Sequence, residues 1–536
     1  MKKIFFIAIF MLFAIFMVGC DSGEKQTFTF TVKPYELREK IEFDVTLNDP
    51  DGQLGKSDIK GTIAKKDSTV IISTKTVNFT AGTTTKTVEF TSLEAGTEYT
   101  VEFYTAFNGK RFSLHKEIYE TTNEGATKET SYKIKDFSDF KNKMKKENDA
   151  YFELANDIDC EGESILSFFT SGNQFKGNFD GKGFTIKNFK LNSTDSDNNP
   201  THTSSETRYF GFFGYIGEGG KISNVTFSDF DIYVLRSSKL SSNQSYYGIA
   251  AGYCAGTLEN VKVLNSSLNV KSTTSSKDKF FVGGLVGQLS KKGTIKNAQV
   301  CADINVQGTF DATVGGVVGT TDGAELISKA NGGNLSASKF DGNINVKLNG
   351  SDSMYISDSH SQTVVGGLVG KNYEALIDNC DSLGAINLTS KFTKNDGQDI
   401  FVGGLVGMNI SDLSVLSNSD SSVAFTITTK DNPTEENKIN VYLGLLAGQN
   451  GSGKPAHSEI TNCHYTLPSG AVNKIELYDN ENVSYSVGVV GKKVSEDIND
   501  SKPTATVDVT VQKYTKPEDS EELVESGSSV IESISE

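Results

Sequence analysis

One short apolar phrase returns throughout the middle of the chain. It reads FVGGLVG at residues 281–287, and its last glycine has counterparts at intervals from 32 residues (Gly287 to Gly319) to 51 residues (Gly319 to Gly370). A repeat of this length indicates a solenoid or a propeller. The eight glycines that end the phrase are Gly214, Gly252, Gly287, Gly319, Gly370, Gly407, Gly448 and Gly491.

Two further short apolar stretches complete each unit. An Ile or Leu followed two residues later by Asn comes soon after the phrase, as in ISNVTF at 222–227, and an apolar–polar–apolar triplet follows, as in Ile304-Asn305-Val306. Three strands per unit, with turn residues between them and almost no helical periodicity, predict one coil of a right-handed parallel β-helix. A propeller blade would need four strands, so we expect β-helix repeats over residues 149–502.

Glycine has a physical role in such a coil. Neighbouring coils lie about 4.8 Å apart, so a position where the chain bends or where two backbones meet favours a residue without a Cβ atom. Alternation puts Gly283 and Gly287 on the same face as Leu285. The pattern leaves open whether this face or the face of Val282 and Val286 points into the coil.

The asparagines of the second strand are another recurring signal. We expect each of them to lie above its counterpart in the next coil, where amide side chains can bond in a ladder. The alternative is that they only form turns at strand ends. The fourth unit departs from the pattern, with Ser328 or Lys329 at the asparagine's place. The seven asparagines are Asn188, Asn224, Asn260, Asn297, Asn379, Asn418 and Asn462.

The open ends of a β-helix need covers. Residues 123–148 predict a linker and a capping helix with Ser138 as its N-cap. Residues 503–514 alternate like an edge strand and are expected to close the other end, and the acidic stretch 515–536 predicts a disordered tail. The apolar side chains at helical spacing in the capping helix are Phe137, Phe140 and Met144.

The phrase and the Ile-x-Asn strand after it resemble the GLUG motif of bacterial surface proteins, which include adhesin-like proteins. The lead-in, YFELANDIDC at 151–160 and FKGNFDGKGFTIKNFKLN at 175–192, looks like the entry that commonly precedes such repeats. The resemblance covers residues 132 to about 500. It implies a β-helical scaffold and no particular activity.

The chain before the repeats follows a different pattern. Residues 27–122 contain about seven alternating runs separated by polar turns, which predicts an antiparallel β-sandwich. LEAGTEYTVEF at 93–103 resembles the fibronectin type III phrase in which a tyrosine, here Tyr99, packs at a strand corner after Leu93 and Gly96. The resemblance implies a spacer domain, although the chain has no tryptophan to supply that family's core residue.

Residues 1–19 have the pattern of a secretory signal, with two lysines followed by fifteen apolar residues. Met17-Val18-Gly19-Cys20 resembles the lipobox of bacterial lipoproteins. The resemblance implies cleavage before Cys20, acylation of its sulfur, and a tether over 20–26 that holds the protein on membrane lipid. An ordinary signal peptide with an incidental cysteine is the alternative.

The charge of the chain argues against some kinds of partner, and its cysteines argue against some kinds of site. The chain has 52 basic and 68 acidic residues, a formal charge of -16, which argues against nucleic acid and against polyanionic partners in general. The cysteines after Cys20 are few and widely spaced, which predicts neither a disulfide framework nor a zinc site. We expect small buried hydrophobic side chains at Cys160, Cys254, Cys301, Cys380 and Cys463.

Three other groups of residues could carry chemistry. Paired aspartates serve as acid and base in some glycan hydrolases, but Asp157 and Asp159 belong to the lead-in of the repeats. An Asp-rich loop could hold calcium, but it lacks EF-hand spacing, and two nearby histidines have no evident acidic partner. We therefore predict no catalytic residue, metal or cofactor. The groups are Asp157 with Asp159, Asp49 with Asp51 and Asp58, and His457 with His464.

The segments that join one coil to the next phrase are polar and vary in length, and they should crowd one side of the rod. We expect a lipid-anchored cell-envelope protein, at the outer membrane or cell surface, whose rod binds an extracellular protein or glycan in adhesion. The alternatives are a glycan-active β-helix enzyme, a lyase or hydrolase, and a purely structural spacer. The segments are 270–279, 349–362, 389–399 and 429–438.

Overall fold

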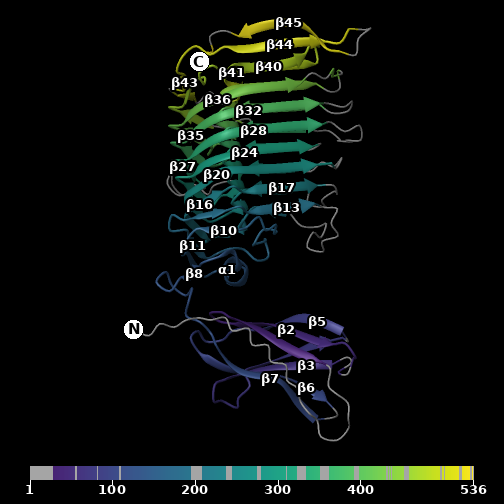
Figure 1. Cartoon of the computed structure of the whole chain (residues 1–536). Coiled ribbons are helices and arrows are strands. Elements are labelled where there is room, and N and C mark those ends of the chain that lie inside the picture. Colours follow the sequence, from purple (N-terminus) through teal and green to yellow (C-terminus); the bar gives the residue numbers. More distant parts are fainter. Residues whose placement is uncertain are drawn as a thin grey trace. The chain divides into compact units, whose positions relative to one another are not determined.

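The computed structural model of the chain divides into two compact units, Met1–Tyr132 and Lys133–Glu536 (Figure 1). None of the described helices is long and apolar enough to cross a membrane. The structure describes residues 28–52, 54, 57–80, 82–107, 110–194, 208–236, 244–273, 279–308, 311–322, 334–349, 361–391, 397–429, 432–433, 435, 438–451, 458–494, 498–499, 501–517, 522–531 and 534.

The first unit consists of two antiparallel sheets that fit the predicted β-sandwich. One sheet has the strand order β1-β2-β5 and the other β4-β3-β6-β7. The strands are β1 (Thr29–Glu36), β2 (Ile41–Asp49), β3 (Ser57–Lys65), β4 (Ser73–Phe79), β5 (Gly82–Phe90), β6 (Glu98–Phe107) and β7 (Lys110–Glu120).

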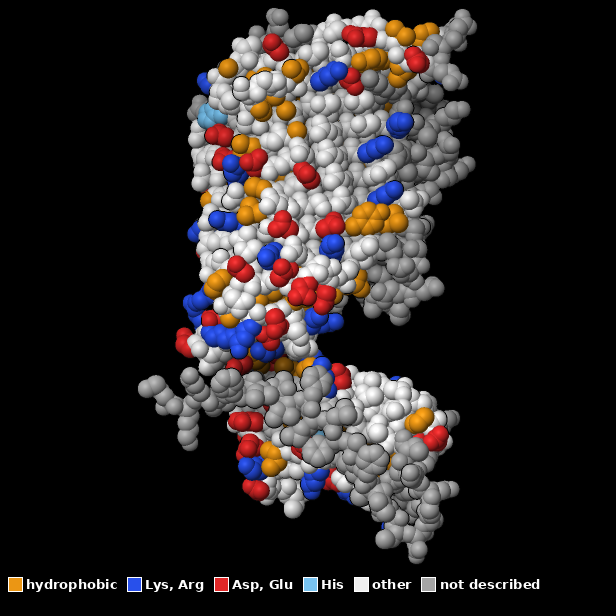
Figure 2. Space-filling model, in the orientation of Figure 1, with side chains coloured by type: hydrophobic (Ala, Val, Ile, Leu, Met, Phe, Trp, Pro, Cys, Tyr) orange, Lys and Arg blue, Asp and Glu red, His pale blue; other side chains and the backbone are white. Residues whose placement is uncertain are grey.

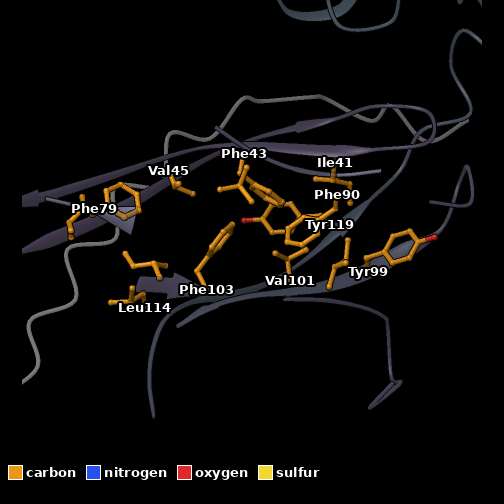
Figure 3. Packing of buried hydrophobic residues seen from close by; sticks show 14 of the residues in the cluster. Ile41, Phe43, Val45, Phe79, Phe90, Tyr99, Val101, Phe103, Leu114 and Tyr119 are labelled. Atoms are coloured by element: carbon orange, nitrogen blue, oxygen red, sulfur yellow. The ribbon is translucent and has the colours of Figure 1, made fainter. Parts of the chain in front are cut away.

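Aromatic rings fill the core of the first unit (Figure 3). The ring of Phe43 meets Phe90, Phe103 and Tyr119 edge to face, with centroids 6.2, 5.3 and 4.9 Å away. Such pairs add about 0.5–1.5 kcal/mol each to the burial of their area. Tyr99 is 1% exposed, and its hydroxyl accepts the Glu94 N–H at 2.8 Å. Phenylalanine and tyrosine rings thus make up much of this core.

The second unit is a parallel β-helix, as predicted, built from a 14-stranded and a 24-stranded sheet (Figure 1). We call the 14-stranded sheet the phrase sheet, because it contains all eight glycine phrases. Its strands are β14 (Arg208–Phe210), β15 (Gly214–Ile216), β18 (Gln244–Gly248), β19 (Ala251–Cys254), β21 (Lys279–Gly283), β22 (Val286–Ser290), β25 (Asp311–Gly315), β26 (Val318–Asp322), β29 (Ser361–Gly366), β30 (Val369–Tyr373), β33 (Gln398–Gly403), β34 (Val406–Ile410), β37 (Ile439–Asn450) and β41 (Val483–Lys493).

The 24-stranded sheet takes the second and third strands of each coil. Its strands are β8 (Tyr132–Ile134), β9 (Tyr151–Leu154), β10 (Ile158–Asp159), β11 (Asn178–Asp180), β12 (Thr185–Lys187), β13 (Lys190–Thr194), β16 (Lys221–Ser228), β17 (Asp231–Arg236), β20 (Thr257–Ser272), β23 (Thr294–Lys296), β24 (Gln299–Gly308), β27 (Asn334–Ser336), β28 (Lys339–Asn349), β31 (Leu376–Asp378), β32 (Asp381–Lys391), β35 (Val415–Ser417), β36 (Asp420–Thr429), β38 (Glu459–Thr461), β39 (His464–Tyr465), β40 (Asn473–Tyr478), β42 (Ile498–Asn499), β43 (Lys502–Pro503), β44 (Val509–Thr515) and β45 (Val524–Ile531).

Successive coils stack in register. Ile304 of β24 pairs with Leu268 of the coil before and with Ile344 of the coil after, and all three side chains are fully buried. Each such side chain contributes about 1.5–3 kcal/mol of burial, and most of that burial needs the neighbouring coil. Stability is therefore shared between adjacent coils.

The predicted front cover exists, but it is shorter than expected. It consists of α1 (Phe137–Asp139) and a π-helical turn, η1 (Phe140–Met144). The N-cap is Asp136 rather than Ser138, because the Asp136 carboxylate accepts the Asp139 N–H at 2.9 Å. The apolar side chains of this cover are buried as expected, and the Phe140 ring lies 5.3 Å from that of Phe212 in the first coil.

The other end of the rod differs from the prediction. The expected closing strand, β44, lies one layer inside the end, where it pairs in parallel with β40. The outermost strand is β45, which pairs antiparallel with β44 and comes from the segment expected to be a disordered tail. The prediction of disorder used the acidic content of residues 515–536 as a whole. The strand itself includes a single acidic residue, Glu525.

Candidate recognition surface

The first six phrases are each divided into two strands by a bend in the middle, whereas β37 and β41 run through the whole of the seventh and eighth phrases. In the third coil β21 ends at Gly283, β22 begins at Val286, and the residues between them form the bend. The N–H groups of Leu285 and Val286 both donate to the carbonyl of Val317 in the next coil, at 3.0 Å each. The bend interrupts the alternation, which is why Val282, Leu285 and Val286 are all fully buried. The third coil thus has four strands, β21, β22, β23 and β24, instead of the three predicted.

The phrase glycines are required by close backbone approach. A Cβ atom on Gly366 would overlap the carbonyl oxygen of Val369 and lie 2.6 Å from the nitrogen of Gly407 in the next coil. A Cβ atom on Gly370 would lie 2.5 Å from the carbonyl oxygen of Gly319 in the coil before. Backbone atoms on both sides leave no room for a side chain. Seven of the eight phrase-ending glycines, all except Gly214, have a backbone atom of an adjacent phrase within 3 Å of the Cβ position.

Two columns of side chains follow the outer face of the bend, one from each half of the phrase. Their members pair in register, one for each coil, so they stack along the axis of the β-helix. Column A contains Tyr209, Tyr246, Phe281, Thr313, Val364, Phe401, Tyr442 and Ser486. Column B contains Tyr215, Tyr253, Gln288, Thr320, Lys371, Met408, Gln449 and Lys492.

The first coils carry a cluster of aromatic rings that joins the two columns. The Tyr209 ring stacks on Tyr246 with centroids 5.4 Å apart and meets Tyr215 of the other column at 4.8 Å. Tyr215 in turn stacks on Tyr253 at 4.4 Å. Tyr209, Tyr215, Tyr253 and Phe281 are only half-buried. Burial, with the nearby Tyr253, raises the pKa of Tyr215. As in any tyrosine near neutral pH, its hydroxyl is protonated and can donate a hydrogen bond.

The later coils close the same face with apolar side chains. Val364, Phe401 and Met408 are 2%, 1% and 5% exposed and pack together outside the main core. The Lys492 ammonium group lies over the Tyr442 and Phe401 rings, 4.9 and 5.5 Å from their centroids, which is cation–π geometry. Solvent therefore reaches the two columns at the aromatic cluster and at Gln288, Thr313 and Lys371, and again in the last coils at Tyr442, Ser486 and Lys492.

A buried column of asparagines runs inside the phrase sheet, and the sequence analysis missed it. The Asn372 amide donates to Asn409 at 2.8 Å, and the Asn409 amide donates to Asn450 at 2.9 Å. All three side chains are fully buried. The signal was present, because an asparagine follows two residues after Gly370, Gly407 and Gly448.

The seven predicted asparagines lie at a different corner, where all have φ between 47° and 58°. Amide groups bond there from coil to coil, Asn260 to Asn224 at 2.9 Å, Asn297 to Asn260 at 2.7 Å and Asn462 to Asn418 at 2.8 Å. These asparagines thus do both things that the sequence suggested. They adopt the left-handed turn conformation that asparagine tolerates, and their amides form a ladder. The ladder is half-exposed or exposed, so it runs along the outside of the rod.

This ladder is interrupted in the fourth coil. Leu335 pairs with Ile295 and Ile377, so Ala337, with φ of 48°, stands in the asparagine's place. Ser328 and Lys329, which the sequence analysis put there, lie outside the described residues. The register of the strands, rather than residue spacing, locates the position.

A second outer ladder runs along the third strands. The amides of Asn305, Asn345 and Asn387 each donate to the asparagine of the preceding coil at 2.9 to 3.0 Å, beginning from Asn269. Figure 2 shows few charged side chains over the middle of this face. Within the ladder an amide uses one N–H and one oxygen lone pair. Its other N–H and lone pair can bond to solvent.

The cysteines behave as expected except for Cys301, which is half-exposed. The Sγ atoms of Cys380 and Cys463 donate to the carbonyl two residues earlier, at 3.3 and 3.4 Å, and the Ser419 hydroxyl of the intervening coil does the same at 2.7 Å. Cysteine and serine thus alternate in one buried corner column. Burial raises the pKa to about 12 for Cys160, Cys254, Cys380 and Cys463.

The aspartate pair of the lead-in is engaged in structural bonds. Asp157 accepts the Thr185 N–H at 2.8 Å. Asp159 accepts the Asn188 amide at 2.9 Å and the Glu161 N–H at 2.8 Å. These bonds, Asn188 first, lower the pKa of Asp159. A general acid needs a raised pKa, so this arrangement favours a structural role.

The other candidate groups also have structural partners. The fully buried Asp49 carboxylate accepts the Leu54 N–H at 2.9 Å. His464 does have an acidic neighbour, contrary to the sequence analysis, since its Nδ1 lies 3.3 Å from Asp420 of the preceding coil; His457 lies outside the described residues. Within the described residues no group of three His, Cys, Asp or Glu could hold a metal ion.

An open cleft of about 500 Å³ lies on the 24-stranded sheet, where β17, β20, β24 and β28 turn. Its carboxylates are bonded within the protein: Asp229 to Ser228 at 2.6 Å, Asp231 to Ser267 at 3.1 Å and Asp303 to Asn343 at 2.9 Å. Lys339 lies 3.8 Å from Asp341. These partners account for the acidic lining.

Two predicted features lie outside the described residues. Cys20 and the signal segment are among them, and so are most residues of the four connecting segments. The strand ends that precede those segments do stack, since Lys271, Gln307, Lys347, Thr389 and Thr428 follow one another in register from coil to coil. The segments therefore leave the coils at one side.

No model of a known protein family matches the chain, and a search of curated proteins finds no similar protein.

Proposed function

We propose that the protein is a lipid-anchored component of a bacterial cell envelope, at the outer membrane or cell surface, whose β-helical rod binds an extracellular glycan or protein in adhesion. The half-exposed cluster of Tyr209, Tyr215, Tyr253 and Phe281 carries the binding part of the proposal. Tyrosines supply rigid amphipathic contact area at little cost in conformational entropy. A cluster of them on an outer face is typical of a recognition surface.

A direct test compares purified chain from residue 21 onward with variants on arrays of glycans and matrix proteins. Tyr215→Ala combined with Tyr253→Ala should weaken binding at least about tenfold, because buried aromatic contacts dominate such interfaces. Tyr233→Ala is the matched control, since Tyr233 is half-buried on the 24-stranded sheet. An unaltered affinity in the double variant would contradict the proposal, and a chain that binds nothing would favour a structural spacer.

The anchor is tested separately. Acylation of Cys20 by two chains would hold the protein on membrane, because each buried CH₂ contributes about 0.8 kcal/mol. Cys20→Ser should remove labelling by radioactive palmitate and move the protein from the membrane fraction to the soluble fraction. Cys301→Ser changes a half-exposed thiol and should leave both unchanged. Persistent labelling of the Cys20 variant would refute the anchor.

A further inference from the structure

Two tyrosines of column B form a stacked pair at the surface. Tyr215 of β15 pairs in register with Tyr253 of β19 in the next coil. Their ring centroids lie 4.4 Å apart, and their planes differ by 23°. Both side chains are half-buried, so solvent reaches part of each ring. Because the strands are parallel, the two side chains leave them in the same direction and the rings lie face to face.

No other pair of tyrosines in the aromatic cluster combines this closeness with parallel faces and exposure. The Tyr209 ring is steeply inclined to both, at 86° to Tyr215 and 72° to Tyr253, with centroids 4.8 and 5.6 Å away. It stacks on Tyr246 at 5.4 Å. Tyr246, however, is 6% exposed, and its hydroxyl donates to Gln244 at 2.9 Å. Tyr215 and Tyr253 are therefore the pair best placed for a reaction between two phenols.

The reaction that such a pair favours is oxidative coupling. A phenol that loses one hydrogen atom becomes a phenoxyl radical, whose unpaired electron is shared between the oxygen and the ortho and para carbons of the ring. Two phenoxyl radicals combine by forming a bond between ortho carbons. Separate phenols must first meet by diffusion, whereas a stacked pair is already in place, and this proximity makes the coupling intramolecular and fast.

We propose that Tyr215 and Tyr253 form a dityrosine cross-link between the first two coils when a peroxidase acting with hydrogen peroxide oxidises the protein. Each phenol gives up one hydrogen atom, and a bond forms between one ortho carbon of each ring. The hydrogens on the joined carbons then move to the two oxygens, which restores both phenols. The chain loses two hydrogen atoms in all, and one hydrogen peroxide is reduced to two waters. The chemistry depends on the ring geometry alone, whereas its occurrence at a cell surface rests on the proposed location.

The cross-link would fasten the start of the rod. It joins residues 38 positions apart, and so closes a loop that contains one whole coil. A covalent link of this kind restricts the unfolded chain more than the folded one. Because stability is shared between adjacent coils, the cross-linked chain should unfold at a higher urea concentration than the untreated chain.

The experiment treats the chain from residue 21 onward with a haem peroxidase and hydrogen peroxide. The chain carries Cys301→Ser, because the half-exposed thiol would consume oxidant. We expect a monomeric product that is lighter by two hydrogen atoms, shows dityrosine fluorescence and, after proteolysis, yields a peptide pair joined through Tyr215 and Tyr253.

Phenylalanine variants keep the rings and remove one reacting hydroxyl at a time. Tyr215→Phe and Tyr253→Phe should each lower the yield of dityrosine at least about tenfold, because the stacked partner is lost. Tyr209→Phe is the matched control, since Tyr209 contacts both rings but is not stacked on either. Its yield should equal that of the parent chain.

Several results would overturn the proposal. They are a treated chain without dityrosine, a link that maps to other tyrosines or joins two chains, and a yield unchanged in both the Tyr215 and Tyr253 variants. A cross-linked chain with an unaltered urea midpoint would overturn the stabilising role of the link. Thermal melting before oxidation shows whether the variants are folded. None of these results bears on the proposed binding function, which the arrays test.

Discussion

Alanine at Gly366 should strongly destabilise the β-helix. The added Cβ would overlap the carbonyl oxygen of Val369 and press on the nitrogen of Gly407 at 2.6 Å. Both are backbone atoms fixed by coil-to-coil pairing, so neither can move without breaking the stack in the middle of the rod. We expect the free energy of unfolding to fall by at least about 4 kcal/mol, measured by urea denaturation followed by circular dichroism.

The matched control is Gly172→Ala in the lead-in. A Cβ atom on Gly172 would have nothing within 4 Å. Its substitution should change the free energy of unfolding by less than about 1 kcal/mol. Equal effects at the two glycines would show that close approach is not what requires glycine in the phrase.

Asn409→Ala should destabilise the rod by about 3 kcal/mol, because each buried polar group left without a partner costs about 1–3 kcal/mol. The Asn409 amide donates to Asn450 at 2.9 Å and to the Glu459 carbonyl at 3.2 Å, and its oxygen accepts the Asn372 amide at 2.8 Å. Removal of one side chain therefore leaves polar atoms unsatisfied in two adjacent coils. The urea midpoint of the variant measures the loss.

Asn387→Ala provides the comparison. Asn387 is exposed and donates to Asn345 at 3.0 Å on the outer ladder. Water can replace that partner, so we expect a loss of less than about 1 kcal/mol. A loss at Asn387 as large as that at Asn409 would mean that stacking alone, and not burial of amides, sets the contribution of the asparagine columns.

The residues that form the β-helix could be predicted from the sequence. A glycine phrase that recurs eight times, an Ile-x-Asn strand and an alternating triplet are local patterns, and local patterns report strand period and turn positions directly. The β-sandwich and the burial of Phe137, Phe140 and Met144 were readable for the same reason. The outermost strand β45 could not be predicted in this way. The acidic content of residues 515–536, taken as a whole, indicated disorder, although the residues that form the strand carry little charge.

The site depended on the tertiary structure. The sequence determined that coils stack, and therefore that like positions meet like positions. It could not determine that the phrase bends between Gly283 and Val286, since both halves read as one strand. That bend brings Tyr209 to Tyr215, with ring centroids 4.8 Å apart, and the coil register stacks Tyr209 on Tyr246 of the next coil. Periodicity in the sequence indicates on which side of a strand a residue lies. Which side chains from different strands come together depends on the bends and on the backbone contacts between coils.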